Sequence, residues 1–214
     1  MSVIAPCITA ESIEAYQQTV ERLTPFASRV HIDLSDGEFA PNFLVGVDSL
    51  YWPANWTVDI HIMSHQPSQY LPSLYALRPH TIIFHAESRE DILPLMQQIK
   101  QVGIRAGVAL LKPTVPKMVA PLIEAADHVM IFSGTLGQYG GTASMMQLEK
   151  IRLVKAINQA IEVGWDGGAA LDNVYSLTQG GVDVINTGGA INRSDDPKAM
   201  YEQMTAELSK HGVL

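Results

Sequence analysis

The sequence alternates between short runs rich in valine and isoleucine and longer stretches in which apolar residues follow a helical period. The alternation occurs eight times, at about 27 residues per unit. The predicted strands cover residues 3–7, 28–34, 57–63, 80–86, 104–110, 127–133, 160–165 and 182–187. The predicted helices cover residues 11–23, 68–77, 89–102, 115–125, 145–158, 171–180 and 196–210, with one further turn expected within residues 43–56. This order is typical of parallel βαβ units, so the sequence predicts an α/β fold.

Eight units in a chain of 214 residues favour a closed (β/α)8 barrel, or TIM barrel, over an open doubly wound sheet. Periodicity alone does not separate the two. However, the Gly-x-Gly-x-x-Gly pattern that often follows the first strand of an open sheet is absent, because the sequence there reads APCITAES. No linker or low-complexity segment divides the chain. We therefore expect a single barrel domain over residues 1–214.

Charge and cysteine content limit the partners that we expect. There are 22 acidic against 14 basic side chains, a net charge of −8, which argues against binding to nucleic acid or anionic membranes. Cys7 is the only cysteine, which suits a reducing compartment. The N-terminal residues do not resemble a signal peptide, and no apolar run approaches the roughly 18 residues of a membrane span. We expect a cytoplasmic protein without a membrane partner.

Reactive side chains occur where the predicted strands end, which is where barrels of this kind carry their active sites. The second strand contains His31 and Asp33. Side chains alternate along a strand, so these two residues share one face, and Val30, Ile32 and Leu34 share the other. Because the apolar face should contact the helices, His31 and Asp33 are expected to point toward the barrel axis.

The third and seventh strands repeat the pattern with His61 and Asp166. One inward histidine is most simply a hydrogen-bonded core residue. Burying an unpaired carboxylate costs several kcal/mol, however, so two histidines and two aspartates at one mouth point to a site. The set suits one divalent transition metal such as zinc, iron(II), manganese or cobalt. Asp59, on the same face as His61, is predicted to be a hydrogen-bond partner of a ligand histidine, and Asp36 to be a turn or supporting residue.

Glycine pairs follow the last three predicted strands. Glycine lets the backbone approach a ligand closely, and backbone amides at such positions can bind an anion without lysine or arginine. One pair is more often a simple turn, but three at adjacent strand ends predict a phosphate site. The pairs are Gly140-Gly141, Gly167-Gly168 and Gly188-Gly189.

At these residues the chain resembles the ribulose-phosphate 3-epimerase family. The similarity extends nearly from end to end and is carried by IAPCI, VHIDLSDGEFAPNF, DIHIM, HQPSQYL, IIFHAES, GVALLKPT, YGG, WDGG and NTGGAI with SDDP. The second of these motifs is specific, whereas the glycine pairs alone are not. The resemblance implies a (β/α)8 barrel of the ribulose-phosphate-binding type that interconverts ribulose 5-phosphate and xylulose 5-phosphate with one divalent metal ion.

The resemblance also assigns roles by position. It implies that the metal ligands are His31, Asp33, His61 and Asp166. Asp33 and Asp166 would also act as the acid/base pair. Substrate contacts are expected from Cys7, His61, Gly140, Gly141, Gly167, Gly168, Gly188 and Gly189.

The sequence departs from the family pattern around the pocket. Cys7 and Gly189 stand where serine is usual, and Ser35 and Phe132 replace two of the usual methionines. A different ketose phosphate, such as allulose 6-phosphate, is therefore an alternative substrate. A sugar-phosphate binder without turnover is a further alternative.

A phosphate-barrel lyase or decarboxylase is another alternative. These enzymes generally carry an Asp-x-Lys-x-x-Asp motif, and here Asp33 is followed by Leu34 and Ser35, without a lysine. The roles of Lys112 and of the His85 and Glu87 pair, structural or supporting, stay open. Relatives in the family self-associate, so we expect a homo-oligomer, and the aromatic residues 51–56 are either an interface or part of the core.

Overall fold

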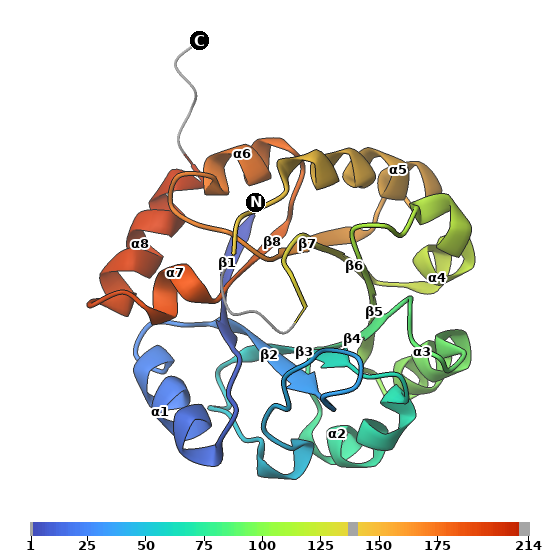
Figure 1. Cartoon of the computed structure of the whole chain (residues 1–214), viewed down its shortest axis with the longest axis horizontal. Coiled ribbons are helices and arrows are strands. Elements are labelled where there is room, and N and C mark those ends of the chain that lie inside the picture. Colours follow the sequence, from blue (N-terminus) through green and yellow to red (C-terminus); the bar gives the residue numbers. More distant parts are fainter. Residues whose placement is uncertain (1, 137–140, 210–214) are drawn as a thin grey trace.

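The structure is a computed structural model that describes residues 2–136 and 141–209, and its eight strands close into a barrel (Figure 1). Every strand is parallel to the next one in the sequence, and β1 pairs with β8 to complete the ring. The strands are β1 (Val3–Ile8), β2 (Arg29–Ser35), β3 (Thr57–Met63), β4 (Thr81–His85), β5 (Arg105–Leu110), β6 (His128–Phe132), β7 (Glu162–Asp166) and β8 (Val184–Thr187). The predicted (β/α)8 barrel is confirmed.

The α-helices lie outside the ring of strands (Figure 1). They are α1 (Ile13–Leu23), α2 (Leu71–Leu77), α3 (Ile92–Gln101), α4 (Ala120–Ala125), α5 (Glu149–Ile157), α6 (Val174–Gln179), α7 (Gly189–Asn192) and α8 (Pro197–Glu207). Short 3-10 helices are η1 (Val47–Ser49), η2 (Pro67–Tyr70), η3 (Pro116–Val119) and η4 (Met145–Leu148). None of the helices in the described ranges has the length and apolar character needed to cross a membrane.

The helices differ from the predicted ranges mainly at their first turns. The α1 helix begins after Ser12, whose side chain accepts a hydrogen bond from the Ala15 amide and so caps the helix. Three ranges predicted as single helices begin instead with η2, η3 and η4, since helix starts often tighten into 3-10 turns. The α7 helix was not predicted, because four residues are too few to show an apolar period.

The aromatic residues 51–56 mainly pack against the chain itself. Trp56 is buried and Trp52 is partly buried against the main apolar core. Tyr51 is the most exposed of the three, and its backbone carbonyl accepts a hydrogen bond from the Tyr16 hydroxyl on α1 at 2.6 Å. The single turn expected in residues 43–56 is present as η1.

The alternation of side chains along β2 builds two different layers. Val30, Ile32 and Leu34 are fully buried in the core between the strands and the surrounding helices. Burial of each such side chain contributes about 1.5–3 kcal/mol to folding. The intervening residues His31 and Asp33 therefore face the barrel interior, as predicted.

Charged side chains form a network at the N-terminal end of the barrel. Arg29 donates two hydrogen bonds to Glu162, at 2.9 and 3.0 Å, and one to Asp59 at 2.7 Å. Glu162 also accepts a hydrogen bond from Arg105 at 3.0 Å and lies 2.8 Å from His128 Nδ1. Since these residues begin β2, β5, β6 and β7, the network ties together strands from both sides of the ring.

Asp59 belongs to this network, so the prediction that it supports a ligand histidine is wrong. One of its oxygens accepts the Arg29 hydrogen bond, and the other lies 3.2 Å from His80 Nδ1. Asp59 lies two residues before His61 on β3, toward the N-terminal end of the strand. Its carboxylate therefore meets the basic side chains at that end.

The network predicts a pH-dependent stability. Burial opposes ionisation of Asp59 and Glu162, but hydrogen bonds from His80, His128 and Arg29 outweigh it and hold both carboxyl pKa values well below their usual range. Carboxylates with lowered pKa values stabilise the fold above the unfolded-state pKa of about 4, and this contribution is lost as the pH falls toward the folded-state pKa.

We expect Glu162→Gln to lower the free energy of unfolding by about 2 kcal/mol at pH 7, because it leaves Arg29 and Arg105 poorly paired. Urea denaturation should show a smaller difference between the unfolding free energies of the variant and the wild type at pH 3. At that pH part of the stabilisation from the ionised Glu162 carboxylate has already been lost in the wild type. An equal difference at both pH values would contradict this account.

Candidate metal centre and active site

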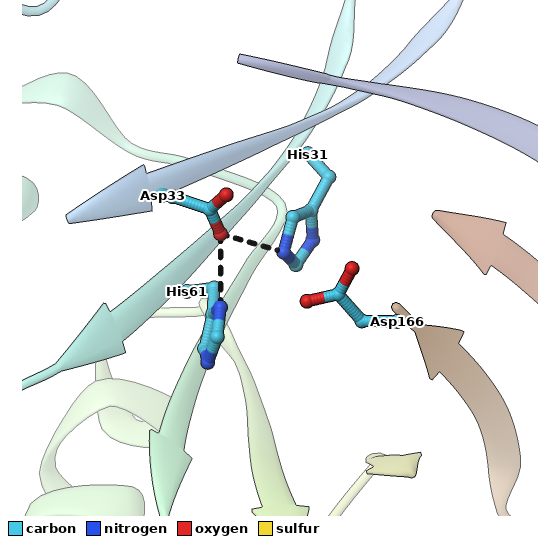
Figure 2. A group of neighbouring side chains, drawn as sticks. All are labelled: His31, Asp33, His61 and Asp166. Atoms are coloured by element: carbon cyan, nitrogen blue, oxygen red, sulfur yellow. Dashed lines mark hydrogen bonds and ion pairs between the residues drawn. The ribbon is translucent and has the colours of Figure 1, made fainter. Parts of the chain in front are cut away.

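Four side chains meet at the C-terminal ends of the strands, as Figure 2 shows. His31 and Asp33 come from β2, His61 from β3 and Asp166 from β7. One nitrogen or oxygen of each residue lies within 4.8 Å of those of the other three. The structure thus brings together all four residues that the sequence predicted as metal ligands.

Strand register places these residues beside one another. In the β2–β3 ladder Asp33 is directly opposite His61, so their side chains project from neighbouring strands at the same height. Asp166 is the last residue of β7, which is separated from β2 by β8 and β1 around the ring. The two carboxylates therefore approach the cluster from different walls of the barrel (Figure 2).

Both oxygens of Asp33 are engaged. Oδ1 lies 2.9 Å from His61 Nδ1 and 3.2 Å from His31 Nε2. Oδ2 accepts a hydrogen bond from the Thr9 hydroxyl at 2.5 Å. Thr9 was not predicted, although it follows Cys7 by two positions and so continues the inward face of β1.

The two aspartates have opposite electrostatic environments. Burial alone would raise the pKa of Asp33, but its contacts with His31 and His61 lower it well below the usual range. Burial raises the pKa of Asp166, and the negative charge of Asp33 raises it further. The Asp166 carboxyl group therefore binds a proton more tightly than the Asp33 carboxyl group does.

The donor set fits a divalent cation. His31 is fully buried; its Nδ1 has no hydrogen-bond partner within the described part of the chain, and its Nε2 lies 3.2 Å from Asp33 Oδ1 without hydrogen-bond geometry. A buried polar atom without a partner costs free energy, and a metal bound at Nε2 would remove that cost. A cation would also offset the repulsion between Asp33 and Asp166. Two imidazoles and two carboxylates suit zinc, iron(II), manganese or cobalt.

A cavity of about 350 Å³ opens beside the cluster. Asp33 and Asp166 line it, whereas His31 and His61 are fully buried and are not among its lining residues. The substrate contact predicted for His61 has no counterpart in the cavity wall. Other predicted pocket residues that line the cavity are Cys7, Ser35, Phe132, Gly141, Gly167, Gly168, Gly188 and Gly189, and Met63 lines it as well. Gly140 lies outside the described residues.

Two of the glycines are required by the backbone itself. Gly167 and Gly168 have φ values of +104° and +73°, which side chains rarely adopt. A Cβ atom at Gly167 would lie 2.1 Å from the Gly134 nitrogen, and one at Gly168 would lie 2.1 Å from the Ala143 nitrogen. The loop after β7 therefore packs directly on the backbone of the segment after β6, beside the cavity.

Further residues complete the wall. Asn42, Asn186 and Arg193 line the cavity, and the sequence patterns had not singled them out. Asn42 and Asn186 stand within the quoted motifs VHIDLSDGEFAPNF and NTGGAI, but no role was predicted for them, and Arg193 follows the second of these motifs. Lys112, in contrast, is exposed and is not among the lining residues.

Comparison with known proteins agrees with this site. A sequence model of the ribulose-phosphate 3-epimerase family matches residues 3–192. The chain belongs to this family. It is 28% identical to the ribulose-phosphate 3-epimerase of Helicobacter pylori over 93% of this chain and 94% of that protein. It is also 28% identical to that of Escherichia coli K12, over 97% and 96%. The chain is accordingly an isomerase, an epimerase that acts on a sugar phosphate.

Solved structures with similar folds are more distant in sequence. The 3-hexulose-6-phosphate synthase of Salmonella typhimurium superposes with a TM-score of 0.71 at 14% identity, over 98% of this chain and all of that one. A Mycobacterium tuberculosis tryptophan synthase chain superposes with a TM-score of 0.73 at 11% identity, over 98% and 93%. At such identities the likeness supports the barrel fold alone.

We expect protein purified without chelators to contain about one divalent ion per chain, and His31→Ala or His61→Ala to lose it, because each removes a nitrogen of the cluster. Elemental analysis of the purified proteins measures this directly. The control is His65→Ala, a histidine outside the cluster, which should keep the metal. If both cluster variants kept one full equivalent of metal, the ion would have to bind at another site, and the proposed ligands would be wrong.

Proposed function

We propose that this member of the ribulose-phosphate 3-epimerase family converts ribulose 5-phosphate into xylulose 5-phosphate by inverting C3. The observation that carries the proposal is the pair Asp33 and Asp166, two carboxyl groups with opposite pKa shifts that line one cavity from different strands. Family membership supports the reaction class.

Inverting a carbon beside a ketone needs a base on one face and an acid on the other. The Asp33 carboxylate, held ionised by its histidine contacts, would remove the C3 proton. Asp166, whose pKa is raised by burial and by the charge of Asp33, would return a proton to the opposite face. In the reverse direction the two groups would exchange roles. The Thr9 hydroxyl, which donates a hydrogen bond to Asp33 Oδ2, would hold this carboxylate in position.

His31, Asp33, His61 and Asp166 would hold one divalent ion. When bound, such an ion supplies stabilisation of the negative charge that develops on the sugar oxygens as the proton leaves. His31, Asp33 and His61 are buried, and this burial would limit access of water to the cluster, which strengthens electrostatic interactions there.

Part of the cavity wall suits a phosphate group. Gly141, Gly188 and Gly189 line it and present backbone without side chains, and the guanidinium-bearing Arg193 lines it as well. A volume of about 350 Å³ lies at the small end of ligand sites, as expected for a five-carbon sugar phosphate. The net charge of −8 does not argue against a bound phosphate, because the proposed contacts come from the glycine backbone and Arg193 beside it and not from the overall charge of the protein.

The lyase alternative is not favoured. That chemistry generally uses a lysine two residues after the first aspartate of the motif, and this position is Ser35. Ser35 is buried and lines the cavity, so no ammonium group occupies this place in the wall.

The test is solvent exchange at C3 in deuterated water, followed by NMR with metal-loaded protein and a panel of five- and six-carbon ketose phosphates. We expect deuterium incorporation and epimerisation with ribulose 5-phosphate, and rates at least tenfold lower with six-carbon analogues. A six-carbon sugar that reacts faster would correct the substrate. Exchange with no member of the panel would refute the epimerase proposal.

Asp166→Asn should lower kcat for epimerisation by at least 10²-fold, since an amide cannot return the proton. The rate with ribulose 5-phosphate is measured with protein whose metal content has been determined, so that loss of the ion is recognised. Epimerisation near the wild-type rate in this variant would contradict the two-carboxylate mechanism.

A further inference from the structure

A second histidine lies behind the proposed metal ligand His61. Nε2 of His61 is 2.8 Å from Nε2 of His85, and the other nitrogen of His85, Nδ1, is 3.1 Å from Glu87 Oε2. His85 is the last residue of β4 and is fully buried. The side chains of Glu87, His85, His61 and Asp33 thus form a continuous chain of polar contacts into the cluster.

Glu87 is held as a carboxylate by the loop after β5. Its Oε1 accepts hydrogen bonds from the Leu111 amide and the Thr114 hydroxyl. An acceptor that already receives two donors favours the ionised form. The Nδ1 atom of His85, facing Oε2 of this carboxylate, must then carry a proton and donate it.

The proton on His85 fixes the tautomer of His61. Burial disfavours a charged imidazole, so a neutral His85 that is protonated on Nδ1 has a lone pair on Nε2. That lone pair can only accept, which makes His61 donate from its own Nε2. The lone pair of His61 then lies on Nδ1, which is 2.9 Å from Asp33 Oδ1. In this tautomer both facing atoms are acceptors, and a cation bound to both would take the place of the hydrogen bond that stabilises ionised Asp33 in the metal-free site.

Aromatic contacts hold the ring of His85 in place. The Phe39 ring lies 4.5 Å from it, centroid to centroid, and the Phe132 ring lies at 6.0 Å in an edge-on arrangement. These contacts restrict rotation of the imidazole, so its two nitrogens stay directed at Glu87 and His61.

We propose that His85 and Glu87 are positioning residues of the metal centre, which keep His61 in the tautomer whose Nδ1 binds the ion. This inference rests on the proposed function, because it presupposes that the cluster binds a metal. Outer partners of this kind typically change metal affinity by about 10–100-fold when they are removed.

The test compares two substitutions at position 85. His85→Leu fills the buried space with an apolar side chain but cannot accept the His61 hydrogen bond. His85→Gln can accept it through the amide oxygen and can donate its amide N–H to Glu87. Zinc affinity is measured by competition with a chromophoric chelator. We expect the leucine variant to bind zinc about 10–100-fold more weakly than the wild type, and the glutamine variant to bind within about threefold.

Thermal unfolding of the metal-free proteins separates positioning from folding. If the leucine variant does not fold, Glu87→Gln replaces it in the comparison, because this variant removes the charge that orients His85. We expect Glu87→Gln to weaken zinc binding by about tenfold. The Glu87→Gln protein should unfold within a few degrees of the wild type.

The outcomes distinguish this inference from the proposed function. Wild-type protein that binds no zinc would refute the metal centre and this inference with it. Wild-type binding with equal affinity in the leucine variant, or in Glu87→Gln where that variant replaces it, would overturn this inference alone. Equal weakening in the glutamine and leucine variants would also overturn it, because the hydrogen bond would then not be the cause.

Discussion

The register of the β2–β3 ladder is the constraint on which the site depends. Seven consecutive residues of β2 are paired with seven of β3, and this pairing sets Asp33 opposite His61. A slip of one residue would turn His31 and Asp33 toward the helices and bring Val30, Ile32 and Leu34 into the mouth. Packing of these apolar side chains in the outer core therefore secures the polar cluster.

The two carboxyl groups at the mouth of the barrel have different surroundings and therefore different pKa values. Histidine contacts and the Thr9 hydroxyl stabilise the ionised form of Asp33, whereas burial near that charge favours protonation of Asp166. The same residue type thus has two different proton affinities within 4.8 Å. At the opposite end of the barrel, Arg29 and Glu162 join strands without contacting the cluster, so stability and chemistry reside at separate ends.

The barrel and the ligand cluster could be predicted because both follow from period-two alternation on strands whose ends meet. His31, Asp33 and His61 lie on the inward faces of recognisable strands, and Asp166 ends another. Alternation does not reveal side-chain partners: Asp59 was predicted to support a histidine but pairs with Arg29 and His80. The role of Thr9, the contact of His85 with His61 and the short α7 helix depend on three-dimensional packing or on segments too short to show a period.

The most direct test of the two-carboxylate account is the isotopic content of both epimers early in the reaction. Ribulose 5-phosphate is incubated with wild-type protein in deuterated water, and the reaction is stopped at about one-tenth conversion. If separate groups remove and return the proton, the xylulose 5-phosphate formed should carry deuterium at C3 in nearly every molecule, while the remaining ribulose 5-phosphate keeps its proton. A product that retains the original C3 proton would show that one group serves both faces, and would contradict the account.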